Sequence, residues 1–527
     1  MPAFSLAKMG KLLAADIVSG DLGDAARLVI RSLDKNPAIV IDVLDDLIKQ
    51  GDKPEPPEDL IAADILMLAN VLEFIRYRVE AGQADGIALV DRVMTRLLDA
   101  EAMGRIAPNL MLLILNQFAI AKLDVGDALR STILRMMESS AAETGASGRE
   151  DLRAMLRDAG DNPFDQHAAL DEVAETLPEA AQAKLVVSLL AEPDEDMGNA
   201  AIGFLLSPSQ MVRPALCAAI ADLGTGIGAA NPAGLRRMIA LRNWLPESDR
   251  PGLDTGIKLL RQKGVACAEW PSPAKADAYV SGFDGSGMQG IFVIVPDGRK
   301  YAVCAMIGRL GMGVRDAWVR KGMAKKDVKA MLGQADGDIG MAPVSFGYVA
   351  VAARHFLAAN LAGGPMPPFG LMAFAEAAGL SNLTPHAITA DELIRQLMEQ
   401  IEPARLAPAT VATVLVRSTK WHDEHTVFSS WFEDSDQVSA ALAGKKKPKA
   451  AQIAAVLAGP IARNRARWTE LLAWTAFSTK QSTDDLPWED FAIVARELSS
   501  GRALSDIPLM QQIARQTVEV TIERRRG

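Results

Sequence analysis

The sequence is poor in the residues that build disulfide frameworks, zinc sites and histidine-dependent active sites. Its 527 residues include three cysteines and five histidines. Cys217, Cys267 and Cys304 are odd in number and far apart in the chain, which fits neither a disulfide framework nor a structural zinc site. Such cysteine usage is typical of a reducing compartment, so we expect a cytoplasmic protein.

Unbroken apolar runs are also absent. The longest uncharged run, residues 356–375, has the length of a membrane span, but it contains three prolines and a pair of adjacent glycines, which break a membrane helix. Near the N-terminus, Lys8, Lys11 and Asp16 interrupt the apolar residues, so there is no continuous signal-peptide core. We therefore expect neither insertion into a membrane nor secretion.

The residues that are present favour helices. Aromatic residues make up only 5% of the chain, whereas Ala, Leu and Met are abundant, as in helices that pack closely through small side chains. A chain of this length predicts about two to four domains or one elongated repeat array. The formal net charge of −10 argues against a protein that coats nucleic acid with its whole surface.

Apolar periodicity predicts where these helices lie. Six apolar positions between residues 61 and 79 step by four and three, which predicts a helix over residues 58–81 with Asp64 and Glu73 on its polar face. A small, polar stretch at residues 139–149 predicts a flexible linker. Similar apolar patterns predict helices over residues 22–33, 37–50, 86–102, 107–122 and 126–139.

The segment around residues 178–263 contains a distinctive turn between two predicted helices. A polar turn at residues 207–210 precedes a Val212-Arg213 pair and a helix rich in Ala and Leu. This passage resembles the turn and second helix of HEAT-type repeats, although Pro214 stands where those repeats usually carry alanine. The resemblance implies stacked helices. The rest of the chain resembles an uncharacterised bacterial protein.

One short region carries a convincing β pattern. Glycine-containing turns, Asp284-Gly285-Ser286-Gly287 and Asp297-Gly298, separate β-branched runs and predict antiparallel hairpins. The middle run, residues 291–295, is apolar at every position, so we expect both faces of the sheet to be covered. After residue 313 we expect helices again. The three predicted strands cover residues 278–283, 289–296 and 300–307.

We therefore predict a mostly α fold. It is an irregular α-helical repeat or solenoid-like array with a small antiparallel three-stranded β insert at about residues 278–307. The predicted parts are an N-terminal helical domain (1–140), a HEAT-like helical segment (150–270), a small basic α/β insert (271–335) and a C-terminal helical domain (336–527).

Positive charge is concentrated around the β pattern. Residues 235–332 contain seventeen Lys and Arg against nine Asp and Glu, a net charge of +8, so the remainder of the chain carries −18. This asymmetry predicts a surface for phosphate, nucleic acid or an acidic partner, or a solvated surface whose charges pair with the acidic remainder. The candidate ligand-binding residues are Arg299, Lys300, Arg309, Arg315, Arg320 and Lys321.

No motif has the full pattern of a catalytic, cofactor or metal site. His422 and His425 are three residues apart and are the weak candidates for metal ligands, but an exposed helix start is the favoured interpretation. Asp336-Gly337-Asp338 lacks the later ligands of a calcium loop and is interpreted as an ordinary loop. We predict no catalytic residue, no cofactor and no metal.

Three hypotheses about function follow from these patterns. The preferred one is a non-catalytic scaffold or adaptor that presents a helical surface to another protein. The alternative is a protein that binds nucleic acid or a phosphorylated ligand through residues 235–332. The third is an enzyme with an unrecognised site in a pocket between the sheet and its flanking helices.

Overall fold

A computed structural model describes residues 5–19, 29, 33, 36–51, 53, 57–80, 83–121, 123–126, 129, 147–273, 275–381, 383–442, 448–483 and 486–524. The chain divides into two compact units, Met1–Ser188 and Leu189–Gly527. The helices predicted over residues 22–33 and 126–139, and the linker at residues 139–146, lie largely outside the described residues. Residues 147–149, also predicted as linker, begin a helix instead.

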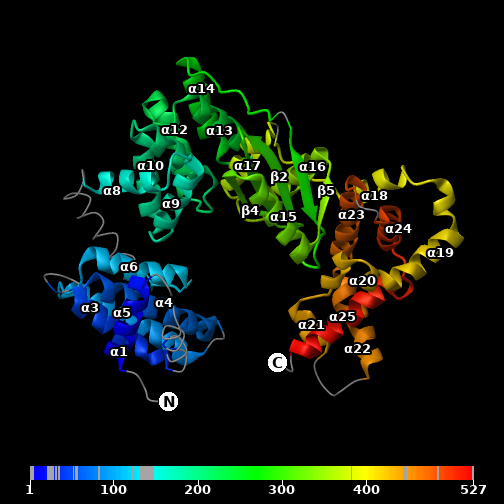
Figure 1. Cartoon of the computed structure of the whole chain (residues 1–527), viewed down its shortest axis with the longest axis horizontal. Coiled ribbons are helices and arrows are strands. Elements are labelled where there is room, and N and C mark those ends of the chain that lie inside the picture. The colour runs from blue at the N-terminus through cyan, green and yellow to red at the C-terminus, as the bar shows by residue number, and fades with distance from the viewer. Residues whose placement is uncertain are drawn as a thin grey trace. The chain divides into compact units, whose positions relative to one another are not determined.

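The N-terminal unit is helical and is built around one long helix, α4 (Figure 1). This helix contacts α1, α3, α5 and α6. It confirms the helix predicted over residues 58–81, and Leu68, Leu72 and Ile75 of the predicted stripe are fully buried. The unit contains α1 (Leu6–Ser19), η1 (Pro37–Ile39), α3 (Val40–Gly51), α4 (Glu58–Glu80), α5 (Ala84–Ala102), α6 (Pro108–Ile120), α8 (Ser147–Asp158), α9 (Pro163–Glu175) and most of α10 (Glu179–Ala191).

Asp64 departs from the prediction for this helix. Periodicity predicts that it lies on the polar face of α4, but it is only 2% exposed, and its Oδ2 has no hydrogen-bond partner among the described residues. Burial, and to a smaller extent the nearby Asp46 carboxylate, raise the pKa of Asp64 to about 7. The face of α4 that sequence periodicity assigned to solvent is therefore covered at this position.

The second unit begins with a helical segment and continues into a five-stranded antiparallel sheet (Figure 1). The strand order is β4-β3-β2-β1-β5. The helical segment contains α11 (Glu195–Ala201), η2 (Ile202–Leu206), α12 (Val212–Leu223), η3 (Gly224–Gly226), α13 (Pro232–Arg242) and α14 (Arg250–Gln262). The strands are β1 (Asp277–Ser281), β2 (Met288–Asp297), β3 (Lys300–Arg309), β4 (Gly313–Met323) and β5 (Met341–Val344).

The three predicted strands are confirmed as β1, β2 and β3, but the sheet has two further strands. The prediction of helix directly after residue 313 is wrong, because β4 begins there. β4 carries exposed Arg315, Asp316 and Arg320 and forms one edge of the sheet, so it lacks the apolar alternation of a half-buried strand. β5 has four residues, includes Pro343 and forms the other edge. β4 and β5 are therefore recognisable as strands only from their pairing with β3 and β1.

Helices cover both faces of the sheet, as the apolar β2 predicted. On one face, Ile294 and Val303 pack against Val328 of α15 (Lys325–Ile339). Gly308 lies five residues beyond Val303 in β3, so it faces the other way. There a Cβ on Gly308 would lie 2.2 Å from Phe356 of α16 (Phe346–Leu361). The helix α17 (Gly370–Ala378) also packs on β4, β3 and β2.

Asn360 of α16 makes hydrogen bonds to backbone groups of the edge strand β4. Its Oδ1 accepts a hydrogen bond from Val314 N at 2.8 Å, and its Nδ2 donates to Val314 O at 3.2 Å. The side chain thus pairs with one residue of the strand as a neighbouring strand would. A Cβ on Gly313, which has a φ of 88°, would lie 2.3 Å from Asn360, so the contact requires glycine.

The C-terminal helices follow α17 and are joined to the sheet. Ser345 N donates to Gln481 O, and Thr483 N donates to Pro343 O, both at 3.1 Å, so the residues at the end of α23 form an isolated antiparallel bridge with the edge strand β5. The remaining elements are α18 (Ala390–Met398), η4 (Pro403–Leu406), α19 (Pro408–Arg417), η5 (Ser418–Lys420), α20 (Trp421–Glu424), η6 (Thr426–Ser430), α21 (Asp436–Ala441), α22 (Lys449–Val456), η7 (Leu457–Ile461), α23 (Arg465–Gln481), α24 (Trp488–Ser499), η8 (Leu504–Asp506) and α25 (Pro508–Arg524).

The fold is mostly helical with a small antiparallel sheet. The solenoid arrangement and the division into four domains stay predictions. Within the described part of the chain, no helix is both long and apolar enough to cross a membrane.

Candidate functional site

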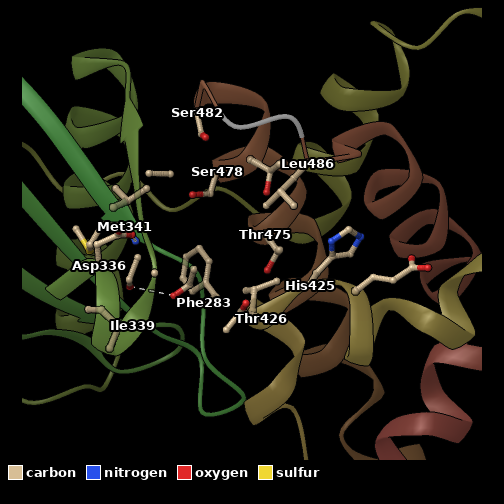
Figure 2. A pocket seen from close by; sticks show the side chains of 18 residues that line it. Phe283, Asp336, Ile339, Met341, His425, Thr426, Thr475, Ser478, Ser482 and Leu486 are labelled. Carbon is tan, nitrogen blue, oxygen red and sulfur yellow. Dashed lines mark hydrogen bonds between the residues drawn. The ribbon is translucent and has the colours of Figure 1, made fainter. Parts of the chain in front are cut away.

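A cavity of about 640 Å³ lies in the second unit, between the sheet and the C-terminal helices (Figure 2). Its volume falls within the range of small-molecule sites, about 300–1,000 Å³. The lining residues are Val280, Ser281, Gly282, Phe283, Asp336, Ile339, Gly340, Met341, Ala342, Glu424, His425, Thr426, Val427, Thr475, Ser478, Thr479, Ser482 and Leu486.

One helix face contributes four hydroxyl side chains to this cavity. Thr475, Ser478 and Thr479 lie on α23, and Ser482 follows its last residue. Their spacing of three, four and seven residues places them on one side of the helix. Thr475, Ser478 and Thr479 are less than 9% exposed. Figure 2 shows Thr475, Ser478 and Ser482 across the cavity from Asp336, Ile339 and Met341. We call these four residues the hydroxyl stripe.

The sequence analysis missed the hydroxyl stripe for a physical reason. Serine and threonine inside a helix commonly bond to the backbone of the preceding turn, and Thr475 Oγ1 does donate to Leu471 O at 2.8 Å. An isolated serine or threonine in a predicted helix therefore does not indicate a binding site. The signal that was available is the regular spacing Thr-x-x-Ser-Thr-x-x-Ser from Thr475 to Ser482.

Glycine allows the sheet wall of the cavity to approach the helices closely. A Cβ on Gly282 would lie 2.5 Å from Cγ2 of Val427. The next residue, Phe283, is buried, and its ring centroid lies 6.4 Å from that of Trp474. Trp431 Nε1 donates to Phe283 O at 3.0 Å. Contacts to several helices thus fix this wall.

A buried hydrogen-bond network lies behind the cavity. Gln289 Nε2 donates to Ser281 O and to Ser478 Oγ, both at 3.0 Å, and its Oε1 accepts from Tyr348 Oη at 2.6 Å. Burial raises the pKa of Tyr348 above its usual range, so the hydroxyl stays protonated and donates. Because Ser281 and Ser478 both line the cavity, the network holds its two walls together.

Replacing Tyr348 with phenylalanine tests this network. The change leaves Gln289 Oε1 without its donor, so we expect the free energy of unfolding to fall by about 1–2 kcal/mol. Urea unfolding followed by tryptophan fluorescence measures it, since all eight tryptophans lie in the second unit. The control is Tyr301→Phe, at a half-buried tyrosine on the α15 face. Equal effects of the two changes would argue against the network.

Three titratable side chains line the cavity. Asp336 and Glu424 are exposed, and Asp336 Oδ1 accepts a hydrogen bond from Met341 N at 2.8 Å. His425 is half-buried, and burial lowers its pKa below the usual value for histidine. At neutral pH its imidazole is therefore uncharged and offers one donor and one acceptor.

The candidate metal ligands do not converge. His425 lines the cavity, whereas His422 does not, and His422 Nδ1 lies 3.2 Å from Phe428 O. Within the described residues, no group of three or more His, Cys, Asp or Glu side chains is placed to hold a metal ion. The interpretation of residues 336–338 as a loop is wrong, because they belong to the last turns of α15.

The six candidate basic residues separate into two groups. Arg309 and Arg315 lie at one end of the sheet, and the nine steps along β3 from Lys300 to Arg309 span about 30 Å. Arg309 is half-buried, and its Nε donates to Ser286 O at 3.1 Å, whereas the other five are exposed. Ligand binding by these residues stays a prediction. The four at the end near the β2–β3 turn are Arg299, Lys300, Arg320 and Lys321.

Other basic residues of the 235–332 region are used inside the fold. Arg236 and Arg237 of α13 share the carboxylate of Glu376 in α17, with N–O distances of 2.8 and 2.9 Å. Arg242 pairs with Asp254 at 2.8 Å. Part of the excess positive charge is therefore neutralised within the unit.

Two segments of the chain match known families. Residues 178–264 match the Y4lR second domain, and residues 391–522 match the Y4lR C-terminal helical domain, which includes α23 and its hydroxyl stripe. The chain is similar to the uncharacterized protein y4lR of Sinorhizobium fredii (strain NBRC 101917 / NGR234), with 24% identity over 378 residues that cover 70% of this chain and 71% of the relative. This is the resemblance to an uncharacterised bacterial protein that we expected. No solved structure shows significant similarity to the chain.

Proposed function

We propose that the protein binds a small polar molecule in the cavity between the sheet and the C-terminal helices. The observation that carries this proposal is the hydroxyl stripe, because three of its four residues are buried and yet border a hollow of small-molecule size. Thr475 Oγ1 donates to Leu471 O, and Ser478 Oγ accepts from Gln289 Nε2, but a hydroxyl oxygen can accept a further hydrogen bond. A ligand with several hydrogen-bond donors matches such a wall.

Rigid walls support the proposal. A binding site selects its ligand best when its side chains are already held in place. Here Gln289 joins Ser281 on the sheet to Ser478 on α23. The backbone bonds between β5 and residues 481–483 join the same two walls at a second point.

A fragment screen with a blocked variant tests the proposal. Thr426 is exposed at the cavity wall, so Thr426→Trp should fill the entrance without disturbing buried packing. We expect polar fragments that raise the melting temperature of the native chain to have no effect on this variant. The matched control is Thr413→Trp on the exposed side of α19. If no fragment distinguishes the blocked variant from the control, the proposal fails.

The same screen separates binding from catalysis, the third hypothesis. NMR spectra of each bound fragment over several hours show whether it is consumed. We expect the fragments to persist. Conversion of a fragment by the native chain, but not by Thr426→Trp, would identify an enzyme.

We further propose that the protein is an adaptor that binds another protein in the cytoplasm, with HEAT-type stacking of residues 178–263. The observation in favour is an exposed apolar face on α6, where Leu113 and Ile120 are 48% and 63% exposed. They are seven residues apart and so share one side of the helix. The free thiol of Cys267 is exposed, which suits a reducing compartment.

Charge substitutions on α6 test the adaptor proposal. We expect the double change Leu113→Glu and Ile120→Glu to remove specific partners from a crosslinked pull-down of bacterial lysate. Met211→Glu is the control, because Met211 is similarly exposed at 49% but lies in the second unit. Recovery of the same proteins with both variants, or of the chain alone, would contradict the proposal.

Nucleic-acid or phospho-ligand binding through residues 235–332 remains the alternative. Electrostatic binding of this kind weakens steeply as salt rises. Fluorescence anisotropy with a labelled oligonucleotide tests it, with the six candidate basic residues changed together to glutamine. Unchanged binding by this variant, or no binding by the native chain, would exclude the alternative.

A further inference from the structure

We infer that the cavity binds a polyhydroxylated small molecule that carries a positive charge, in the chemical class of the amino-polyols. The inference rests on the proposed function and adds the class of ligand. Three features of the cavity lead to it: the hydroxyl stripe, the sign of the charged groups that line it, and the apolar side chains between them.

The hydroxyl groups match a ligand with hydroxyl groups of its own. Each serine or threonine hydroxyl can donate one hydrogen bond and accept others. Ser281 and Thr426 add further hydroxyls to the lining. The neutral imidazole of His425 again offers both a donor and an acceptor. Because the Thr475 hydroxyl already donates to Leu471 O, it can accept from a ligand hydroxyl, whereas the His425 imidazole can also donate to one.

The charges that line the cavity are negative. Asp336 near the end of α15 and Glu424 at the end of α20 both line it, and the described lining residues include no Lys or Arg. Nearby cations are engaged elsewhere: Arg467 Nη2 donates to Gly285 O, and Lys480 lies 4.9 Å over the ring of Trp488. The lining therefore attracts a cation and repels phosphate or carboxylate groups.

Apolar side chains complete the fit. Phe283, Ile339 and Met341 lie on the sheet side of the cavity, opposite the hydroxyl stripe (Figure 2). They offer surface to the carbon chain of a polyol, while its hydroxyls face α23. A fully apolar ligand would cover the hydroxyl oxygens of Thr475 and Ser478 without offering them a further donor, whereas a polyol offers one.

A charge-matched series of six-carbon polyols tests the class of ligand. Glucamine is cationic, glucitol is neutral and gluconate is anionic at neutral pH, and the three have closely similar carbon chains. Ligand-observed NMR titration of the full chain measures their affinities. We expect glucamine to bind most tightly and gluconate not to bind. Raising the salt concentration should weaken the binding of glucamine more than that of glucitol, because the higher affinity of glucamine is electrostatic.

Removing the two carboxylates should remove this preference. In Asp336→Asn with Glu424→Gln, the asparagine keeps the Oδ1 acceptor for Met341 N. Each exposed charge pair is worth roughly two- to fivefold in affinity, so we expect glucamine to weaken by roughly fourfold or more, to the level of glucitol. The control pair is Asp327→Asn with Glu399→Gln, at exposed carboxylates of α15 and just after α18.

The outcomes separate this inference from the proposed function. Equal or tighter binding of glucitol or gluconate, blocked by Thr426→Trp, would overturn the cationic class and leave the cavity as a binding site. Failure of all three polyols, while other fragments bind and are blocked, would overturn the polyol class alone. Failure of all three polyols and of the fragment screen would overturn both.

Discussion

Replacing Glu376 with glutamine lowers the free energy of unfolding of the second unit by about 3–5 kcal/mol, because it removes the buried carboxylate charge that two buried arginines share. Glu376 accepts from Arg236 Nη2 at 2.8 Å, and from Arg237 Nε and Nη2 at 2.9 and 3.0 Å. All three residues are less than 10% exposed. The contact joins α13 to α17, so the loss also loosens the helical segment from the sheet.

Urea unfolding followed by tryptophan fluorescence measures this effect, since Trp244 packs in the same region. Trp244 is fully buried, and its Nε1 donates to Leu383 O at 2.7 Å. The control is Glu399→Gln, which removes an exposed ion pair with Arg395 and should cost no more than about 0.5 kcal/mol. A loss below about 1 kcal/mol for Glu376→Gln would mean that the arginines reach water or another acceptor.

Replacing Asp64 with asparagine removes a pH dependence from the N-terminal unit. The pKa of Asp64 is raised from 3.8 in the unfolded chain to about 7 in the fold. The native state therefore holds a proton that the unfolded state releases, and stability falls as pH rises through this window. The total loss between pH 4 and pH 8 is on the order of 4 kcal/mol. At pH 8 the variant should be the more stable protein by a similar amount.

Circular dichroism and tryptophan fluorescence together show whether the pH dependence belongs to the N-terminal unit. The N-terminal unit contains no tryptophan. We therefore expect a pH-dependent helical transition by circular dichroism in the native chain, with no matching change in fluorescence. Parallel pH profiles for the native chain and Asp64→Asn would show that the carboxyl group is not buried as described.

Sequence patterns predicted the elements whose own residues show apolar periodicity or a characteristic turn. The stripe from residue 61 to 79 located α4, and the Asp-Gly turn before Arg299 located the β2–β3 hairpin, with Gly298 at a φ of 60°. β4 and β5 could not be found this way. Their residues are exposed, charged or proline-containing, and they are strands because β3 and β1 offer them free edges.

The cavity could not be predicted from the sequence for a related reason. Its walls come from residues 280–283, 336–342, 424–427 and 475–486, and no local pattern shows that these segments meet. In the sequence, His425 belongs to a candidate metal pair with His422, and Asp336 belongs to a separate Asp-Gly-Asp segment. The fold brings them to one cavity, where they are binding groups of a different kind. Asp64 shows the converse: the pattern assigns it to the surface, but it is buried in the fold, where a Cβ on Gly10 of α1 would lie 3.4 Å from its Oδ1.

A crystal structure of the full chain soaked in glucamine is the most direct test of the central claim. We predict electron density for one molecule between the hydroxyl stripe of α23 and the sheet, with its amine near Asp336 or Glu424. An empty cavity at a concentration that saturates binding in solution, or a molecule seated elsewhere on the protein, would contradict the account.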